Sequence, residues 1–185
     1  MLGLVLTAGP FSNPGQIVSA KGQEYCRGLR FLEIRRVREE EWAQLRELRL
    51  RALSADPGAF GSSAAEESAY SEKRWREMAR GQVFVAIDDS RWVGMAGCFQ
   101  EDDVMWVWGI WLVPSRRGKG VGRRLLDEAM KCALDQGSPH VRLSVTENNT
   151  AAETLYRDYG FVETGRRKPL RSDPSLVEVE LERST

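Results

Sequence analysis

From about residue 31 onward, apolar and polar positions of this chain follow strand-like and helix-like spacings in turn. Strands are predicted where apolar residues alternate with polar ones or form short continuous runs. The predicted strands are residues 31–37, 83–87, 92–99, 104–113, 141–145, 161–162 and 176–181. Helical spacing of apolar residues predicts helices at 39–53, 71–80, 121–136 and 149–159. Hairpins followed by a strand–helix–strand crossover predict an α+β domain with one mixed, mostly antiparallel central sheet and about four flanking helices.

The predicted strand at 104–113 is apolar at almost every position, as expected for a central strand that is covered on both faces. Gly109 inside it marks a bulge or a close backbone approach. Counting by two along the strand places Trp106 and Trp108 on one face and Trp111 on the other. Such aromatics usually pack in a core, and at least one of them is a candidate wall of a ligand pocket.

Residues 1–31 follow no such pattern, because glycines and prolines interrupt every short apolar run. We expect an N-terminal extension there, poorly ordered or loosely docked, followed by one domain over residues 32–185. The chain has 27 basic and 27 acidic residues, which argues against a general nucleic-acid binder. No apolar run approaches the roughly 20 residues of a membrane span. We therefore expect a cytoplasmic protein with no nucleic-acid and no membrane partner.

Three cysteines without close spacing argue against a disulfide framework and against a zinc site. Cys98 and Cys132 lie within apolar patterns and are expected to be buried free thiols. No metal site is predicted.

A glycine-rich loop joins the central strand to the helix at 121–136 and carries the strongest chemical signal. Gly118, Gly120 and Gly122 stand at alternate positions, where the absence of Cβ atoms leaves room for a ligand and permits unusual φ angles. Backbone N–H groups of the loop and of the first helical turn, aided by the helix dipole, form a site suited to phosphate oxygens.

The loop departs from two familiar nucleotide-binding patterns. Lys119 is followed by Gly120, with no Ser or Thr to hold magnesium as in a P-loop, and the dinucleotide pattern G-x-G-x-x-G also fails. The pattern R-x-x-G-x-G, from Arg117 through Gly120 to Gly122, resembles the pyrophosphate loop of the GNAT superfamily of acetyltransferases.

A second motif downstream strengthens this resemblance. The pattern N-x-x-A-x-x-L-Y-x-x-x-G-F is met at every fixed position from Asn149 to Phe161, in the order and at the separation expected for the cofactor-side motifs of that superfamily. Asn149 would cap a helix or offer its amide to the pantetheine arm. Tyr156, two turns later on the same helix face, would protonate the leaving thiolate or hydrogen-bond its sulfur; packing alone is the alternative. The resemblance covers roughly residues 32–183.

The resemblance implies an N-acetyltransferase that moves an acetyl group from acetyl-CoA to a primary amine by direct attack on the thioester. The backbone N–H of Leu112 matches the oxyanion donor, and Tyr156 the group that serves the thiolate. The expected cofactor-binding residues are Leu112, Val113, Arg117, Gly118, Lys119, Gly120, Val121, Gly122, Asn149 and Tyr156.

The general base is not identified, because the central strand lacks the glutamate that many members carry there. Weak candidates are Glu66, Glu101, Asp102, Asp103, His140 and Glu147, and an ordered water is another. A non-catalytic acyl-CoA-binding module and a nucleotide-phosphate binder therefore stay as alternatives. The acceptor, a small-molecule or peptide amine, stays open, as do the acyl length and the oligomeric state, for which a homodimer is one candidate.

Overall fold

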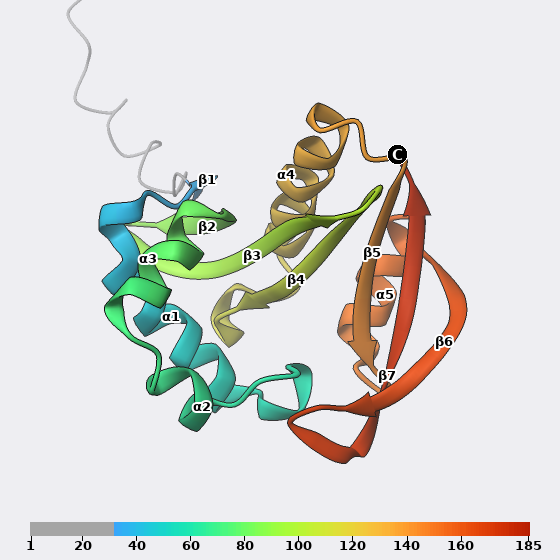
Figure 1. Cartoon of the computed structure of the whole chain (residues 1–185). Coiled ribbons are helices and arrows are strands. Elements are labelled where there is room, and N and C mark those ends of the chain that lie inside the picture. The colour runs from blue at the N-terminus through green and yellow to red at the C-terminus, as the bar shows by residue number, and fades with distance from the viewer. Residues whose placement is uncertain (1–31) are drawn as a thin grey trace, which may run out of the picture. The chain divides into compact units, whose positions relative to one another are not determined.

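The computed structural model describes residues 32–185, which form a seven-stranded sheet in the order β1-β2-β3-β4-β5-β7-β6 (Figure 1). The strands are β1 Leu32–Arg36, β2 Gln82–Asp88, β3 Arg91–Glu101, β4 Val104–Leu112, β5 His140–Thr146, β6 Val162–Leu170 and β7 Asp173–Ser184. Neighbouring strands are antiparallel except β4 and β5, which are parallel. The predicted mixed, mostly antiparallel sheet is confirmed.

Five α-helices connect these strands within the described residues, together with three short 3₁₀ turns. They are α1 Trp42–Ala55, α2 Ala64–Ser68, α3 Glu72–Arg80, α4 Val121–Asp135 and α5 Thr150–Asp158, with η3 Glu39–Glu41, η4 Pro57–Ala59 and η5 Pro114–Arg116. The extra helix relative to the prediction is α2, which follows a small-residue loop. Ser63 caps it by accepting a hydrogen bond from the Glu66 N–H.

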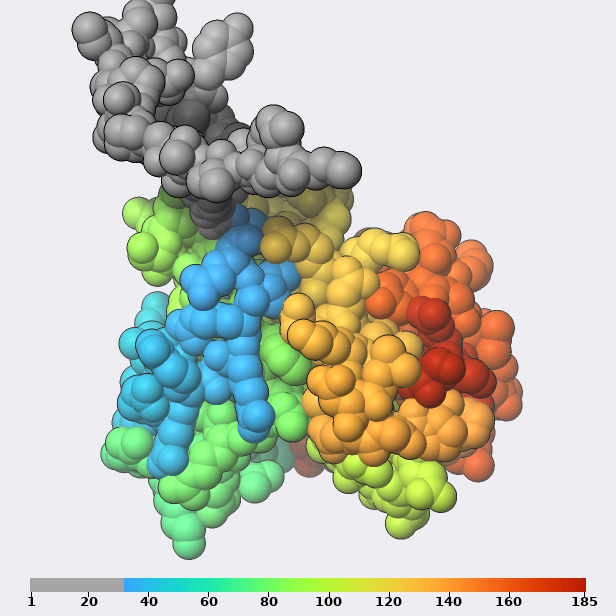
Figure 2. All heavy atoms as spheres, turned by 90° about the horizontal axis from the view of Figure 1, so that it is seen from above, coloured from blue at the N-terminus to red at the C-terminus, as the bar shows by residue number. Residues whose placement is uncertain are grey.

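Helices cover both faces of the sheet. Helix α4 packs on β2, β3 and β4, whereas α1 packs on β3 and α3 on β2. Figure 2 shows α4, in gold, between the blue N-terminal elements and the red C-terminal strand. The apolar stripe predicted for α4 is the buried one, with Leu125, Ala129 and Ala133 fully shielded from solvent. Burying a leucine of this kind contributes about 2 kcal/mol.

The two C-terminal strands are longer than predicted. Strand β6 spans Val162–Leu170, where a two-residue strand was expected, and almost every residue in it is exposed. It lies at the edge of the sheet, where charged side chains block pairing with other chains. The basic residues 166–168 are of this kind, and because of them the sequence of β6 shows no apolar alternation.

Both cysteines in the described region, Cys98 and Cys132, are buried free thiols, as predicted. Among residues 32–185, no helix has the length and apolar character that crossing a membrane requires. The same residues contain no group of His, Cys, Asp or Glu arranged to hold a metal ion. The expectation for residues 1–31 lies outside the described part of the chain.

Candidate active site

The central feature is a gap that opens between β4 and β5. The recorded pairs between these strands are Val104–His140, Met105–Val141 and Trp106–Arg142, all at one end. Beyond Trp106 the strands diverge, as Figure 1 shows toward the bottom of the view. The open end therefore leaves one edge of β4 without a strand partner, next to the start of the glycine-rich loop.

A bulge shapes β4 where it borders this gap. The register between β3 and β4 shifts between Met95 and Gly97, and Gly109 has a φ of +66°. The bulge predicted at Gly109 is confirmed, since a positive φ here favours glycine.

The bulge overturns the predicted distribution of tryptophans. Trp108 lies 5.4 Å from the Arg49 guanidinium of α1, and the Trp111 indole N–H donates to Asp56 at the end of α1 (2.7 Å). Both rings therefore face α1, whereas Leu112 faces Gly122 of α4. Counting by two was wrong here because the bulge inserts one extra residue and shifts the alternation.

Leu112 is the better placed of the two predicted backbone donors. Val113 donates its N–H to Val93 of β3 (2.9 Å) and accepts from Arg116 N–H through its carbonyl (2.9 Å). Because N–H groups alternate in direction along a strand, the Leu112 N–H points away from β3 and toward the gap.

The glycine-rich loop has the geometry of an anion site. Gly118 and Gly120 have φ values of +68° and +76°, and no atom lies within 4 Å of a Cβ built on either. Gly120 is the N-cap of α4, and no side chain caps that end of the helix. The first amides of α4, from Val121 and Gly122, are therefore available to a phosphate, which fits the pyrophosphate of acetyl-CoA.

The basic side chains of the loop are bound to other parts of the protein. Arg117 donates to the carbonyl of Leu112 (3.0 Å) and to Asp56 (2.5 Å), and Lys119 folds back on the carbonyl of Ser115 (2.9 Å). Arg116 forms an ion pair with buried Asp88 at the end of β2. The backbone N–H of Arg117 also donates to the carbonyl of Pro114 (3.2 Å), so both the guanidinium and the amide of this expected cofactor-binding residue have partners within the protein.

Helix α5 brings the second motif to the same place. Asn149 caps it by accepting a hydrogen bond from Ala152 N–H (3.4 Å), which leaves the side-chain NH₂ group available. Leu155 approaches Gly122, so α5 contacts the start of α4. Tyr156 is buried, burial raises its pKa to about 12, and its hydroxyl has no recorded protein partner.

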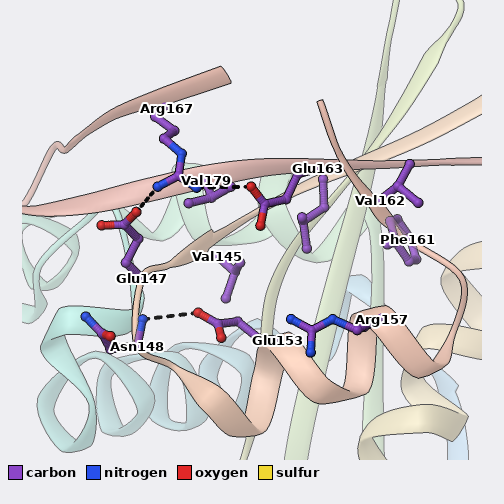
Figure 3. A pocket seen from close by; sticks show the side chains of 11 residues that line it. Val145, Glu147, Asn148, Glu153, Arg157, Phe161, Val162, Glu163, Arg167 and Val179 are labelled. Carbon is purple, nitrogen blue, oxygen red and sulfur yellow. Dashed lines mark hydrogen bonds and ion pairs between the residues drawn. The ribbon is translucent and has the colours of Figure 1, made fainter. Parts of the chain in front are cut away.

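A pocket among the described residues lies elsewhere, between α5 and the β6–β7 hairpin (Figure 3). It has a volume of about 630 Å³, and its lining includes the candidate base Glu147 but none of the expected cofactor-binding residues. Figure 3 shows Arg167 reaching both Glu147 and Glu163 across it. Glu147, one candidate base, is therefore already paired.

Four other candidate bases lie at the end of β4 that is far from Leu112. Glu101, Asp102 and Asp103 form the β3–β4 turn, and His140 pairs with Val104 at the closed end of the gap. Eight residues separate Val104 from Leu112, which corresponds to roughly 25 Å of extended strand.

Three acids at the end of α1 and in α2 are bound to arginines. Glu66 is held by Arg171 (3.1 Å), Glu67 by Arg49 (2.7 Å) and Asp56 by Arg117. Sequence reasoning did not find the pairing of Asp56 with Arg117 or of Arg49 with Glu67, because the two partners of each pair come from different elements.

Comparison with known proteins agrees with this geometry. The family model described as Acetyltransferase (GNAT) family matches residues 36–161. The streptothricin acetyltransferase of Streptomyces lavendulae is 32% identical over 125 residues, which cover 63% of this chain and 64% of that protein. The chain therefore spans just under two thirds of this relative's length.

Two solved structures share the fold at low sequence identity. An acetyltransferase of the GNAT family from Streptococcus pneumoniae has a TM-score of 0.72 at 18% identity, covering 83% of this chain and 99% of that chain. A Salmonella typhimurium acetyltransferase with its cofactor acetyl-CoA has a TM-score of 0.68 at 18% identity, covering 83% and 94%.

Proposed function

Because the chain belongs to the GNAT family of acetyltransferases, we propose that its N-acetyltransferase activity resides in residues 32–185 and uses acetyl-CoA to acetylate a primary amine by direct attack. The observation that supports this proposal is the uncapped start of α4, where Leu112 of β4 and Leu155 of α5 both approach Gly122. These contacts bring together β4, the glycine-rich loop and the helix that carries Tyr156.

The acceptor nitrogen attacks the carbonyl carbon of the thioester. A carbon–nitrogen bond forms, the carbon–sulfur bond breaks, and the sulfur leaves as the thiolate of CoA. The Leu112 N–H donates to the carbonyl oxygen while negative charge develops there. The amides of Gly118 to Gly122 hold the pyrophosphate, which fixes the thioester beside β4.

Tyr156 supplies the proton that the leaving thiolate takes up. Its pKa of about 12 keeps the phenol protonated at neutral pH, so it enters the reaction as a donor. The Asn149 NH₂ group hydrogen-bonds the pantetheine arm in this proposal, while the side-chain oxygen caps α5.

The attacking amine releases its proton to water, and Tyr156 regains a proton from water after the thiol has formed, which restores the phenol. The release to water follows from the pairing of Asp56, Glu66 and Glu67 with arginines, since each carboxylate already accepts charged hydrogen bonds. The acceptor itself is a small-molecule amine, as the name of the streptothricin acetyltransferase indicates for that relative. A peptide amine is the competing acceptor class.

Calorimetric titration with acetyl-CoA, with ATP as the control ligand, tests the proposal. We expect acetyl-CoA to bind and ATP not to bind. A panel of diamines, amino acids and peptide N-termini, assayed by release of the CoA thiol, then identifies the acceptor class. A folded sample that does not bind acetyl-CoA would contradict the proposal.

The non-catalytic acyl-CoA-binding module is the second candidate, favoured by the pairing of Asp56, Glu66 and Glu67 with arginines. Binding of acetyl-CoA without turnover across the whole amine panel, from pH 6 to 10, would favour this alternative. Turnover with any amine would exclude it.

A further inference from the structure

The turn formed by residues 56–58, which runs from the end of α1 into η4, spans the open end of the gap. It contains Asp56, Pro57 and Gly58, and it contacts β4 through its first residue and β5 through its last. Figure 1 shows this segment, in teal after α1, crossing below the diverging strands. One three-residue turn therefore touches both strands that border the gap.

The β4 side of this connection is a small polar network. Asp56 accepts a hydrogen bond from the Trp111 indole (2.7 Å) and another from Arg117 (2.5 Å). Arg117 in turn donates to the carbonyl of Leu112 (3.0 Å). Partial burial alone would raise the pKa of Asp56, but the hydrogen bonds from Arg117 and Trp111 outweigh it and hold that pKa below its usual value.

The β5 side is a single directed hydrogen bond. The Thr146 hydroxyl donates to the carbonyl of Gly58 (2.8 Å), and Thr146 is buried. Gly58 also packs against β7, because a Cβ built on it would lie 3.1 Å from Leu176. The turn is thus fixed at its β5 end by both a hydrogen bond and close packing.

These contacts matter because no strand pairing holds β4 and β5 together at this end. Paired strands lie about 4.8 Å apart, which is set by their hydrogen bonds. The recorded pairs stop at Trp106 and Arg142, so the separation farther along must be set by something else. Within residues 32–185, the turn 56–58 is one connection that reaches both strands there.

We propose that the turn Asp56–Gly58 is a spacer that sets the width of the gap, with Asp56, Trp111 and Thr146 as positioning residues. This inference rests on the proposed function, because the gap is where the thioester would lie. A displacement of about 1 Å at a reacting centre can cost a hundredfold in rate, so a fixed width has a direct catalytic value.

The test compares the variants Asp56→Asn and Thr146→Val with their double variant. Asp56 and Thr146 act on different strands, so independent roles would make their effects multiply. If both residues hold one spacer, loss of either contact allows the width of the gap to change, and the second substitution then adds little to the Kd. We expect each single variant to raise the Kd for acetyl-CoA about fivefold, the equivalent of one hydrogen bond, and the double variant to resemble the weaker single variant.

Two further variants serve as controls for the spacer interpretation. Thr164→Val removes a threonine hydroxyl that binds Glu180 on the exposed β6 edge, and we expect its Kd to match wild type. Trp111→Phe removes the indole N–H together with part of the ring but leaves the Asp56–Arg117 pair, so a raised Kd in this variant separates the spacer from a direct effect on the loop. Melting temperatures show whether each variant is folded.

Three results would overturn the spacer. In the first, the single variants have lower melting temperatures but the same Kd for acetyl-CoA as Thr164→Val, which would show a merely structural role. In the second, the rise in Kd of the double variant equals the product of the rises in the single variants, which would show two independent roles. If wild type does not bind acetyl-CoA, the proposed function fails. The spacer is then decided by crystal structures: an unchanged Leu112–Val145 separation in the double variant would rule it out.

Discussion

The two sides of the β4–β5 gap are built differently. On the cofactor side, the loop 117–122 offers backbone amides, two glycines with positive φ and an uncapped helix end. On the other side, facing α1 and α2, the surface consists of aromatic rings and carboxylates paired with arginines. A backbone site depends on local conformation, whereas a side-chain site depends on partners that distant segments supply. The backbone site therefore tolerates few residue types, whereas the side-chain site tolerates few changes in packing.

The largest effect should come from breaking the buried pair on the α1 side. Arg49 and Glu67 have side chains only 7% and 4% exposed, and the Arg49 guanidinium lies 4.8 Å from the Phe60 ring centre. We expect Arg49→Met to cost about 3–5 kcal/mol of unfolding free energy, because it strands the Glu67 charge. Urea denaturation measures this. Removing both charges with Arg49→Met/Glu67→Met should restore most of the loss, and a double variant as unstable as the single would contradict this account.

Tyr156→Phe tests the chemistry at the gap itself. We expect kcat to fall about 100-fold while the Kd for acetyl-CoA stays unchanged, since the phenol acts only on the leaving thiolate. Tyr159→Phe is a matched control three residues later. In wild type, burial and Asp127 also raise the pKa of Tyr159 to about 12, but the Tyr159 hydroxyl donates to Asp127 (2.7 Å). Equal rate losses in the two variants would show that neither phenol transfers the proton.

Gly120→Ala tests whether the cofactor side depends on backbone conformation. A side chain at φ +76° costs about 1–2 kcal/mol, so the loop should relax and acetyl-CoA should bind roughly tenfold more weakly. Gly137 lies at the other end of α4 with φ +67° and equally open surroundings. Gly137→Ala should therefore lower the melting temperature without changing the Kd. If both variants keep wild-type affinity, the loop amides do not hold the ligand.

The smallest effect should be an acid-dependent one, remote from both sides of the gap. Two hydrogen bonds from Arg35 (2.6 and 2.8 Å) are the main cause that lowers the pKa of Glu41 from 4.5 to about 2. Because the folded-state pKa is depressed, the stabilisation is present above about pH 4.5 and is lost as the pH falls toward 2.

Solvent screening limits this contribution to about 1 kcal/mol. Denaturation of Glu41→Gln between pH 3 and 7 should therefore show a flatter acid limb than wild type, with an unchanged Kd for acetyl-CoA at pH 7. If the stability of Glu41→Gln falls with decreasing pH as steeply as that of wild type, the acid loss of stability comes from other carboxylates.

The elements that sequence reasoning found are those with local signatures. Gly118 and Gly120 have the positive φ that their spacing suggested, and Asn149 caps α5 as its position before a helix indicated. Strand β6 was underestimated, because an exposed edge strand rich in arginine lacks apolar alternation. The faces of Trp108 and Trp111 were misjudged, because a bulge shifts the alternation by one residue.

The sequence by itself determined the order of elements, the family and the loop whose amides face outward at the start of α4. These follow from backbone preferences and hydrophobic periodicity, which act over a few residues. Only the tertiary structure decided where the Arg117 side chain goes, which acids are paired, and that the turn at Asp56 connects both strands of the gap. Those outcomes depend on contacts between segments up to 88 residues apart, such as Gly58 and Thr146, and no local pattern records which distant partner a charged or hydroxyl side chain will meet.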